Sequence, residues 1–302
     1  MSHIIDEVGN TPCIEIPCKK PGVQIFAKCE WFNPSGSVKD RAAANMIKKG
    51  LEAGDVEGKT LIDATSGNTG IAYALYGASL GIPVELALPE NASEERKLIL
   101  KNYGVKLHLT SGLEATDGAQ RFVDELVANN KSKYFFPNQY ANDNNWKAHV
   151  ASTGPEIWHQ TNEKVTHFVA GLGTTGTFIG TSRFLQPKGV HCVSVEPNTP
   201  MHGLEGWKHM ETAIVPEIYD RSVANDTLEA DTARSYELAK AASKYLGLML
   251  SPSAAANLDA AVQLADHVKQ GVIVTVFADN AMKYLTDQFW SDDAYTIDNP
   301  FI

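Results

Sequence analysis

Short apolar runs and longer helical patterns alternate along most of this chain of 302 residues. Thr60–Ala64 and Val84–Leu88 are predicted as strands, and each is followed by a helical pattern. The second half repeats the alternation at Thr166–Leu172 and His191–Pro197, with a final strand predicted at Val272–Ala278. Strands that alternate with helices build mostly parallel sheets with helices on both faces. We therefore expect an α/β fold.

Length and charge narrow the class of protein. At about 150 residues per domain, the chain has room for two domains. A net charge of -10 argues against a nucleic acid or an anionic membrane as partner. We find no signal peptide and no run of about 18 apolar residues. The four cysteines form no C-x-x-C pair and the histidines are scattered, so we expect a cytoplasmic protein with reduced thiols and no metal site.

One lysine stands where a positive charge is unfavourable. Asn33–Arg41 is a Pro/Gly/Ser loop that leads into a helical pattern, which places Lys39 in the first helical turn. A cation is disfavoured at a helix N-terminus, and this cost disappears if the amine is neutral or bound in a Schiff base. Lysine amines in such surroundings act as nucleophiles. Taken alone, Lys39 is more simply a solvated lysine, so it is only a candidate.

Two loops after predicted strands are rich in glycine and hydroxyl groups. Gly173–Thr177 offers backbone N–H groups, three threonine hydroxyls and a helix N-terminus, which together suit a phosphate. It has no lysine for a P-loop and no third glycine for a dinucleotide fingerprint. Thr65–Thr69 has the same character and suits a carboxylate. For each loop, a tight turn with capping hydroxyls is an equally good interpretation.

A reactive lysine, a phosphate cradle and a carboxylate cradle are what pyridoxal phosphate chemistry on an amino acid requires. Asn33–Arg41, Thr65–Gly70 and Gly173–Thr177 resemble the signature stretches of the cysteine synthase family, the O-acetylserine sulfhydrylases. Pro89–Arg96, Thr153–Trp158 and the Thr174-Thr175 pair resemble its B-type isozyme. The resemblance extends from Gly9 to Leu285. It implies a two-domain fold type II pyridoxal phosphate enzyme, each domain a mostly parallel twisted sheet with helices on both faces.

The resemblance implies a role for each matching residue. Lys39 would form the Schiff base and move the Cα proton, Asn68 would bind the ring hydroxyl, and Ser253 would face the pyridine nitrogen. The residues implied for the cofactor phosphate are Gly173, Thr174, Thr175, Gly176 and Thr177. Those implied for the substrate carboxylate are Thr65, Ser66, Gly67, Thr69 and Gln139.

The implied activity is a β-replacement that forms L-cysteine from an O-activated serine, with O-acetylserine favoured, through an α-aminoacrylate. The sulfur donor would be sulfide or thiosulfate. Alternatives are an O-phosphoserine sulfhydrylase, a cystathionine β-synthase, a β-cyanoalanine synthase, or a catalytically weakened docking protein that still binds the cofactor. Residues 1–36 and 142–302 would form the larger domain and 37–141 a smaller movable one. The expected partners are a second copy of the chain, in a homodimer, and the C-terminus of serine acetyltransferase.

The chain departs from the family pattern in two places. Ala254 and Ala255 follow Ser253 where the family has Ser-Gly. The irregular, charged segment Asn198–Asp231, expected to face the substrate, has Glu205-Gly206 where the B-type isozyme carries an arginine pair. Use of thiosulfate or O-phosphoserine therefore does not carry over. The chain also ends in Ile302, and insertion of this tail into its own active site is a hypothesis.

Overall fold

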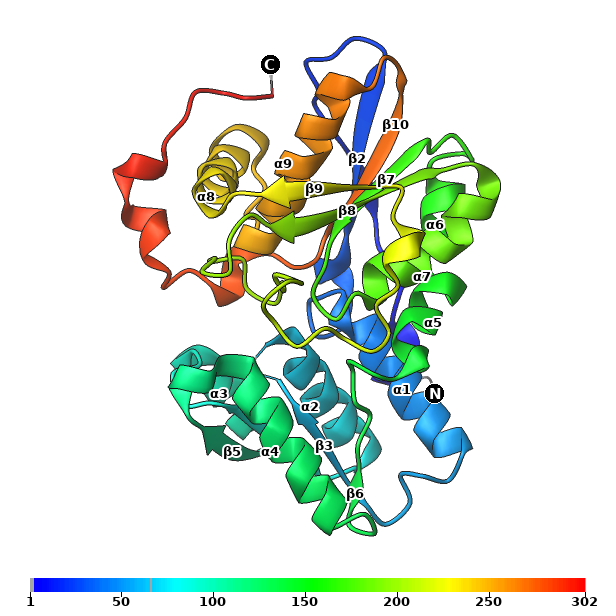
Figure 1. Cartoon of the computed structure of the whole chain (residues 1–302), viewed down its shortest axis with the longest axis vertical. Coiled ribbons are helices and arrows are strands. Elements are labelled where there is room, and N and C mark those ends of the chain that lie inside the picture. The colour runs from blue at the N-terminus through cyan, green and yellow to red at the C-terminus, as the bar shows by residue number, and fades with distance from the viewer. Residues whose placement is uncertain (1–2, 66, 302) are drawn as a thin grey trace. The chain divides into compact units, whose positions relative to one another are not determined.

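The computed structural model describes residues 3–65 and 67–301. It contains one six-stranded and one four-stranded sheet with helices around them, which confirms the predicted α/β class (Figure 1). The chain forms two compact units. Unit 1 comprises Met1–Val8 and Asn33–Asn145, and unit 2 comprises Gly9–Phe32 and Trp146–Ile302. The division at residues 37 and 141, and the mobility of the smaller part, remain predictions.

Unit 1 is built on a parallel sheet with the strand order β5-β4-β3-β6. Its strands are β3 (Thr60–Ala64), β4 (Val84–Pro89), β5 (Lys106–Thr110) and β6 (Tyr134–Phe135). Its helices are α1 (Lys39–Glu52), α2 (Asn68–Leu80), α3 (Glu94–Asn102) and α4 (Ala115–Asn129). Side chains alternate between the two faces of a strand. Leu61 therefore joins the apolar cluster of α1 and α2, while Ile62 packs with Val123 of α4.

Unit 2 is built on a sheet with the strand order β1-β2-β10-β7-β8-β9, in which only the β1–β2 pair is antiparallel. Its strands are β1 (Cys13–Ile16), β2 (Val23–Cys29), β7 (His167–Gly171), β8 (His191–Pro197), β9 (Asp226–Ala230) and β10 (Gly271–Phe277). Its helices are α6 (Thr153–Gln160), α7 (Gly176–Leu185), α8 (Thr232–Ala241), α9 (Pro252–His267) and the part of α5 (Asp143–Ala151) from Trp146 onward.

The structure differs from the sequence-based expectations in three places. The edge strands β1 and β9 had not been predicted, and β9 lies inside the segment expected to be irregular. An edge strand pairs on one side only and buries little, so its apolar pattern is weak; only Ala230 of β9 is buried. The sequence also predicts one helix over Asn144–Gln160 that is broken at Gly154-Pro155, whereas the break lies at Ser152. Pro155 is in the first turn of α6, where its missing N–H removes no helical hydrogen bond.

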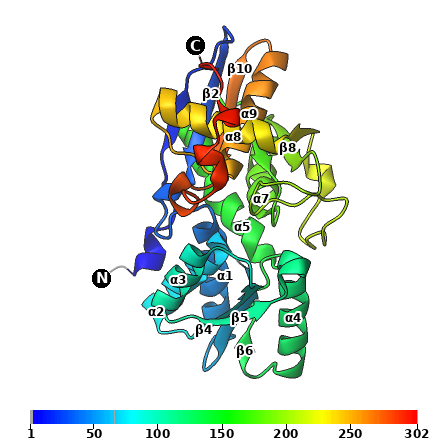
Figure 2. The same ribbon diagram turned by 90° about the vertical axis from the view of Figure 1, so that its left-hand side faces the viewer.

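The C-terminal segment packs on unit 2, beside α8 (Figure 2). Phe289 stacks on Tyr236 of α8 with ring centroids 4.2 Å apart, and Tyr295 meets the same ring edge-on at 5.2 Å. Phe301 is 2% exposed and belongs to the apolar core of unit 2. Ile302, on which the tail-insertion hypothesis depends, lies outside the described residues.

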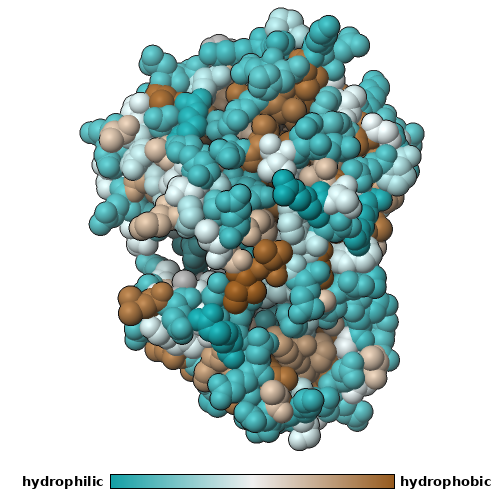
Figure 3. Space-filling view, viewed as in Figure 1, coloured by the Kyte–Doolittle hydropathy of each residue, from teal (hydrophilic) through white to brown (hydrophobic). Residues whose placement is uncertain are grey.

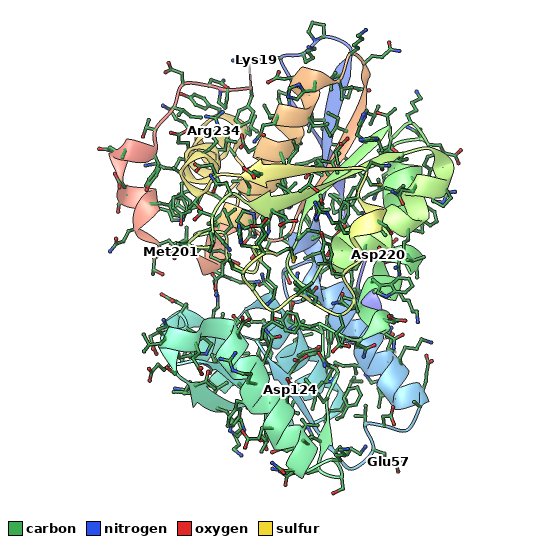
Figure 4. The ribbon with its side chains drawn as sticks, in the orientation of Figure 1. Lys19, Glu57, Asp124, Met201, Asp220 and Arg234 are labelled. Atoms are coloured by element: carbon green, nitrogen blue, oxygen red, sulfur yellow. The ribbon has the colours of Figure 1, made fainter. Side chains whose placement is uncertain are left out.

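The face of the molecule seen in Figure 3 is mainly hydrophilic, with scattered hydrophobic side chains. Two large hydrophobic side chains are almost fully exposed, Leu113 at 98% and Met201 at 93%. Met201 lies on the loop after β8 (Figure 4). Across residues 3–65 and 67–301, no helix combines the length and the apolar character needed to cross a membrane.

A buried carboxylate in unit 1 gives a pH-dependent contribution to stability. Glu85 of β4 is 7% exposed, with His108 Nε2 at 2.7 Å, Tyr134 Oη at 3.0 Å and Lys106 Nζ at 3.3 Å. Burial alone would raise the pKa of Glu85, but these hydrogen bonds outweigh it and lower the pKa from 4.5 to about 2. The ionised side chain therefore stabilises the fold at neutral pH.

We expect Glu85→Gln to lower the melting temperature by about 2–5 °C at pH 7. A depressed carboxylate pKa contributes stability above its unfolded value, and that contribution is lost as the pH falls toward the folded value. The difference in melting temperature between the unaltered protein and Glu85→Gln should therefore narrow from pH 5 to the lowest pH that can be measured. Calorimetric melts at several pH values test this, and a gap that widens toward acid would contradict it.

Candidate active site

The loop before Lys39 is held in place by Asp40, the residue after Lys39. Helix α1 begins at Lys39, as predicted, and the Lys39 side chain is half-buried. The buried Asp40 carboxylate accepts hydrogen bonds from Ser35 N at 2.8 Å, Ser35 Oγ at 2.5 Å, Ser37 N at 3.2 Å and the Tyr76 hydroxyl. Burial raises the pKa of Asp40, and these hydrogen bonds oppose that effect. Lys39 therefore extends from a fixed loop-to-helix junction.

The predicted carboxylate loop lies between β3 and α2. Helix α2 begins at Asn68, and Gly67 N donates to Thr65 Oγ1 at 3.3 Å. Thr69 donates to the side-chain oxygen of Gln139 at 2.8 Å, although 70 residues separate the two in the chain. The structure thus brings Gln139 to the loop. Ser66, the remaining residue assigned to the carboxylate, lies outside the described residues.

The predicted phosphate loop follows β7 in unit 2. Helix α7 begins at Gly176, and its N-cap residue Thr175 has a φ of +72°. This conformation is uncommon for a residue other than glycine. The Thr175 hydroxyl is buried, and nothing among the described residues forms a hydrogen bond with it. The first N–H groups of a helix also have no partner within the helix.

A second loop, which contains Gly206 and Lys208, packs against the predicted phosphate loop. A Cβ added to Gly173 would lie 2.2 Å from the carbonyl oxygen of Gly206, so the two backbones meet where neither has a side chain. Lys208 N also donates to Leu172 O at 2.9 Å. The start of the segment expected to face the substrate therefore supports the phosphate loop.

This cradle fits a phosphate monoester. The buried Thr175 hydroxyl and the N-terminal N–H groups of α7 supply donors, and the helix dipole favours negative charge. The loop contains no lysine that would bind a further phosphate group. These features match a cofactor held by one terminal phosphate.

Ser253 lies in the first turn of α9. The helix is capped by Ser251, whose side chain accepts from Ala254 N at 3.2 Å and lies 3.2 Å from Ser253 Oγ. Ala255 is buried in the core and its N–H bonds to Ser251 O at 2.9 Å. Alanine therefore fits this helical turn without strain, and the departure from Ser-Gly leaves Ser253 at the helix start.

Two polar residues that sequence reasoning missed support the phosphate loop. Asn257 of α9 accepts from Gly171 N at 2.8 Å, at the end of β7. His149 of α5 is 1% exposed and lies between two threonines, with Nε2 3.4 Å from Thr177 Oγ1 and Nδ1 2.8 Å from Thr153 Oγ1. Asn257 could have been noticed as an amide that follows three alanines in an apolar helix. His149 gave no comparable signal.

Lys39, Asn68, the carboxylate loop and Gln139 belong to unit 1, whereas the phosphate loop and Ser253 belong to unit 2. Each unit thus contains one predicted anion-binding loop at the carboxyl end of a parallel strand, the position where open α/β sheets bind ligands. That all these residues serve a single site remains a prediction. No cluster of three metal-ligating side chains occurs within residues 3–65 and 67–301.

Comparison with known proteins identifies the class. The family model for pyridoxal-phosphate dependent enzymes matches residues 4–279, and the chain belongs to this family. Among relatives, the cysteine synthase of Aquifex aeolicus is 48% identical over 301 residues, covering 96% of this chain and 92% of that protein. Cysteine synthase B of Pseudomonas aeruginosa is 36% identical, covering 94% of this chain and 95% of its own.

Comparison with solved structures supports the same family. The crystal structure of a cysteine synthase (OASS) from Entamoeba histolytica matches with a TM-score of 0.91 at 32% identity, covering 97% of this chain and 91% of that one. The predicted resemblance to cysteine synthases and the predicted fold type II architecture are confirmed, and the cofactor is pyridoxal phosphate.

Proposed function

We propose that this protein is a cysteine synthase that forms L-cysteine from O-acetylserine by β-replacement, with sulfide as the sulfur donor. The observation that carries the proposal is the pairing of Thr69 with Gln139 under the loop at the end of β3. Such a cradle suits the carboxylate of an amino acid, and the enzymes of this family depend on pyridoxal phosphate. The cysteine synthases among the relatives support O-acetylserine as the substrate.

The residues would divide the work between cofactor and substrate. Gly173–Thr177 would hold the cofactor phosphate, Asn68 its ring hydroxyl and Ser253 its ring nitrogen. Thr65, Ser66, Gly67, Thr69 and Gln139 would orient the substrate carboxylate. When bound, pyridoxal phosphate supplies an electron sink that makes the Cα–H bond of the substrate acidic.

Lys39 would carry both the cofactor and the proton. Its amine would hold the cofactor at rest and, once the substrate amine has displaced it, would remove the Cα proton. Loss of that proton allows the acetate on Cβ to leave. After sulfide adds at Cβ, Lys39 would return the proton to Cα. The fixed loop around Asp40 keeps the lysine backbone in place between the two transfers.

Ser253 gives a prediction about reaction specificity. A neutral hydroxyl opposite the ring nitrogen leaves that nitrogen unprotonated and the electron sink weaker, which favours prompt loss of the β-substituent over transamination. We expect Ser253→Asp to raise the share of side products about tenfold or more, measured by chromatography of the products. Ser253→Ala, which is also neutral, is the control. Unchanged partitioning in Ser253→Asp would contradict this role.

The decisive experiment follows both half-reactions in the purified holoenzyme. O-acetylserine alone should shift the visible absorption band of the bound cofactor, and sulfide should restore it with release of L-cysteine. O-phosphoserine, serine and thiosulfate are tested in parallel. A band that does not respond to O-acetylserine but responds to one of these would replace the substrate assignment. No response to any of them would favour the docking-protein alternative.

We further propose a cytoplasmic homodimer as the working form, with the C-terminus of serine acetyltransferase as a binding partner. The family resemblance supports each of these. Light scattering of the purified protein tests the dimer, and titration with a synthetic acetyltransferase C-terminal peptide tests the partner.

A further inference from the structure

A buried carboxylate lies directly beneath the carboxylate loop. Asp63, in β3, is 1% exposed. Its Oδ1 accepts from Ala64 N at 2.8 Å, and its Oδ2 accepts from Tyr73 Oη at 2.9 Å and Gln139 N at 3.3 Å. Burial raises the pKa of Asp63 to about 7, against the effect of these hydrogen bonds; Asp124 on α4 (Figure 4) also raises it. Burying a carboxylate is costly, so its position calls for a reason.

The contacts of Gln139 fix the orientation of its amide. One side-chain atom of Gln139 lies 3.2 Å from Ala64 O and the other 2.8 Å from Thr69 Oγ1. A carbonyl oxygen can only accept, so the nitrogen must face Ala64 and the oxygen must face Thr69. Gln139 therefore keeps one N–H for a further acceptor.

The same argument assigns the Thr69 proton. Because Gln139 Oε1 can only accept, the Thr69 hydroxyl must donate its single proton to it. Thr69 then has no proton to give a substrate carboxylate while this bond is intact. Thr69 thus orients Gln139, and the remaining Gln139 N–H is left for a substrate carboxylate.

We propose that Asp63 is a positioning residue that sets the substrate-carboxylate cradle through the backbones of Ala64 and Gln139. Its two oxygens join the end of β3 to the segment that carries Gln139, and Tyr73 of α2 holds the carboxylate from below. Asp63 touches neither substrate nor cofactor in this role. The inference rests on the proposed function, because it requires a substrate with a carboxylate.

A carboxylate suits this position better than an amide. Three donors converge on Asp63, and a carboxylate has only acceptor sites to offer them. Asparagine would direct its own N–H groups toward at least one of these donors. Asp63→Asn therefore keeps the size of the side chain but breaks the connection to Gln139 or to Ala64.

The experiment measures substrate binding by the holoenzyme. Asp63→Asn should raise the KM for O-acetylserine about ten- to a hundredfold with a smaller change in kcat, as when partners behind ligating groups are lost. O-acetylserine added without sulfide should show the same increase in its apparent dissociation constant, read from the visible band. Asp259→Asn is the matched control: Asp259 is also buried, at 4% exposure, but bonds to Gln263 and Arg234.

A double-mutant cycle separates positioning from general damage. If Asp63 acts through Gln139, adding Asp63→Asn to Gln139→Ala should weaken binding by less than about threefold. Fully additive effects, or an unchanged KM in Asp63→Asn, would overturn the inference. If Asp63→Asn does not fold or does not bind the cofactor, the Tyr73→Phe variant tests the inference instead. It removes one donor to Asp63 and should raise KM in the same direction by a smaller factor.

The failure of the proposed function has a different signature. In that case the unaltered protein would form no cysteine from O-acetylserine. The titration is then made with L-serine, which carries the carboxylate and amine of any α-amino acid. A weaker response in Asp63→Asn than in Asp259→Asn would uphold the inference, and equal responses would overturn it.

Discussion

Lys39→Ala should abolish cysteine formation, lowering kcat by at least about a thousandfold, because one amine serves as cofactor anchor and as the base and acid at Cα. The variant should also lose the visible absorption band of the lysine-bound cofactor. Helix α1 begins at this residue, and the Asp40 carboxylate holds the loop before it through Ser35 N and Ser37 N. The fold should therefore survive, with a normal circular dichroism spectrum.

Lys48 provides the matched control for this prediction. It lies on the same helix, is 41% exposed and pairs with Asp6 at 2.8 Å, so Lys48→Ala should keep both band and turnover. Borohydride reduction followed by peptide mapping should place the cofactor on the peptide that contains Lys39. A Lys39→Ala protein that keeps its band, or a cofactor mapped to another lysine, would refute the assignment.

Gly173→Ala should weaken cofactor binding about ten- to a hundredfold and lower the free energy of unfolding by about 1–3 kcal/mol. The added Cβ would lie 2.2 Å from Gly206 O, and both partners are backbone, so no side chain can rotate away. One of the two loops must move, and the phosphate loop is one of them. Fluorescence titration of the apoenzyme with pyridoxal phosphate measures the dissociation constant.

Gly189→Ala is the control for that substitution, because it adds the same methyl group to unit 2, outside the predicted cradle, at a position where nothing lies within 4 Å of it. Its effect on the dissociation constant should be at most a few-fold. If Gly173→Ala binds pyridoxal phosphate as tightly as Gly189→Ala, the close contact between the two loops does not shape the cradle.

Local patterns predicted the central elements well. The bounds of β3 and the start of α1 agree with the prediction, because a fully buried strand and a loop-to-helix junction each have a strong local pattern. Helix α2 begins at Asn68, inside the stretch Thr65–Thr69 that was predicted as a loop, since Asn-Thr-Gly resembles a loop when read alone. The edge strands β1 and β9 were missed because edge strands bury few side chains.

The site residues likewise fall into those that the sequence indicated and those that only the structure shows. Lys39 and the two loops were assigned from motifs and Ser253 from the family resemblance, and the geometry of Thr175 and Gly173 gives the predicted phosphate loop a physical basis. The contact of Thr69 with Gln139 joins positions 70 residues apart, so no local pattern contains it. The family resemblance suggested Gln139, but only the structure shows that Thr69 orients it and that Asp63 lies behind both.

The strand order also has a consequence for how the chain folds on the ribosome. The unit 1 sheet uses strands between Thr60 and Phe135, so all its pairing partners have been synthesised soon after that point. In unit 2, Ile25 pairs with Ile273, and β10 separates β2 from β7. Until β10 leaves the exit tunnel, one side of β2 and one side of β7 stay unpaired. A nascent chain stalled before Gly271 should therefore aggregate readily, and chaperones should be needed most at the end of synthesis.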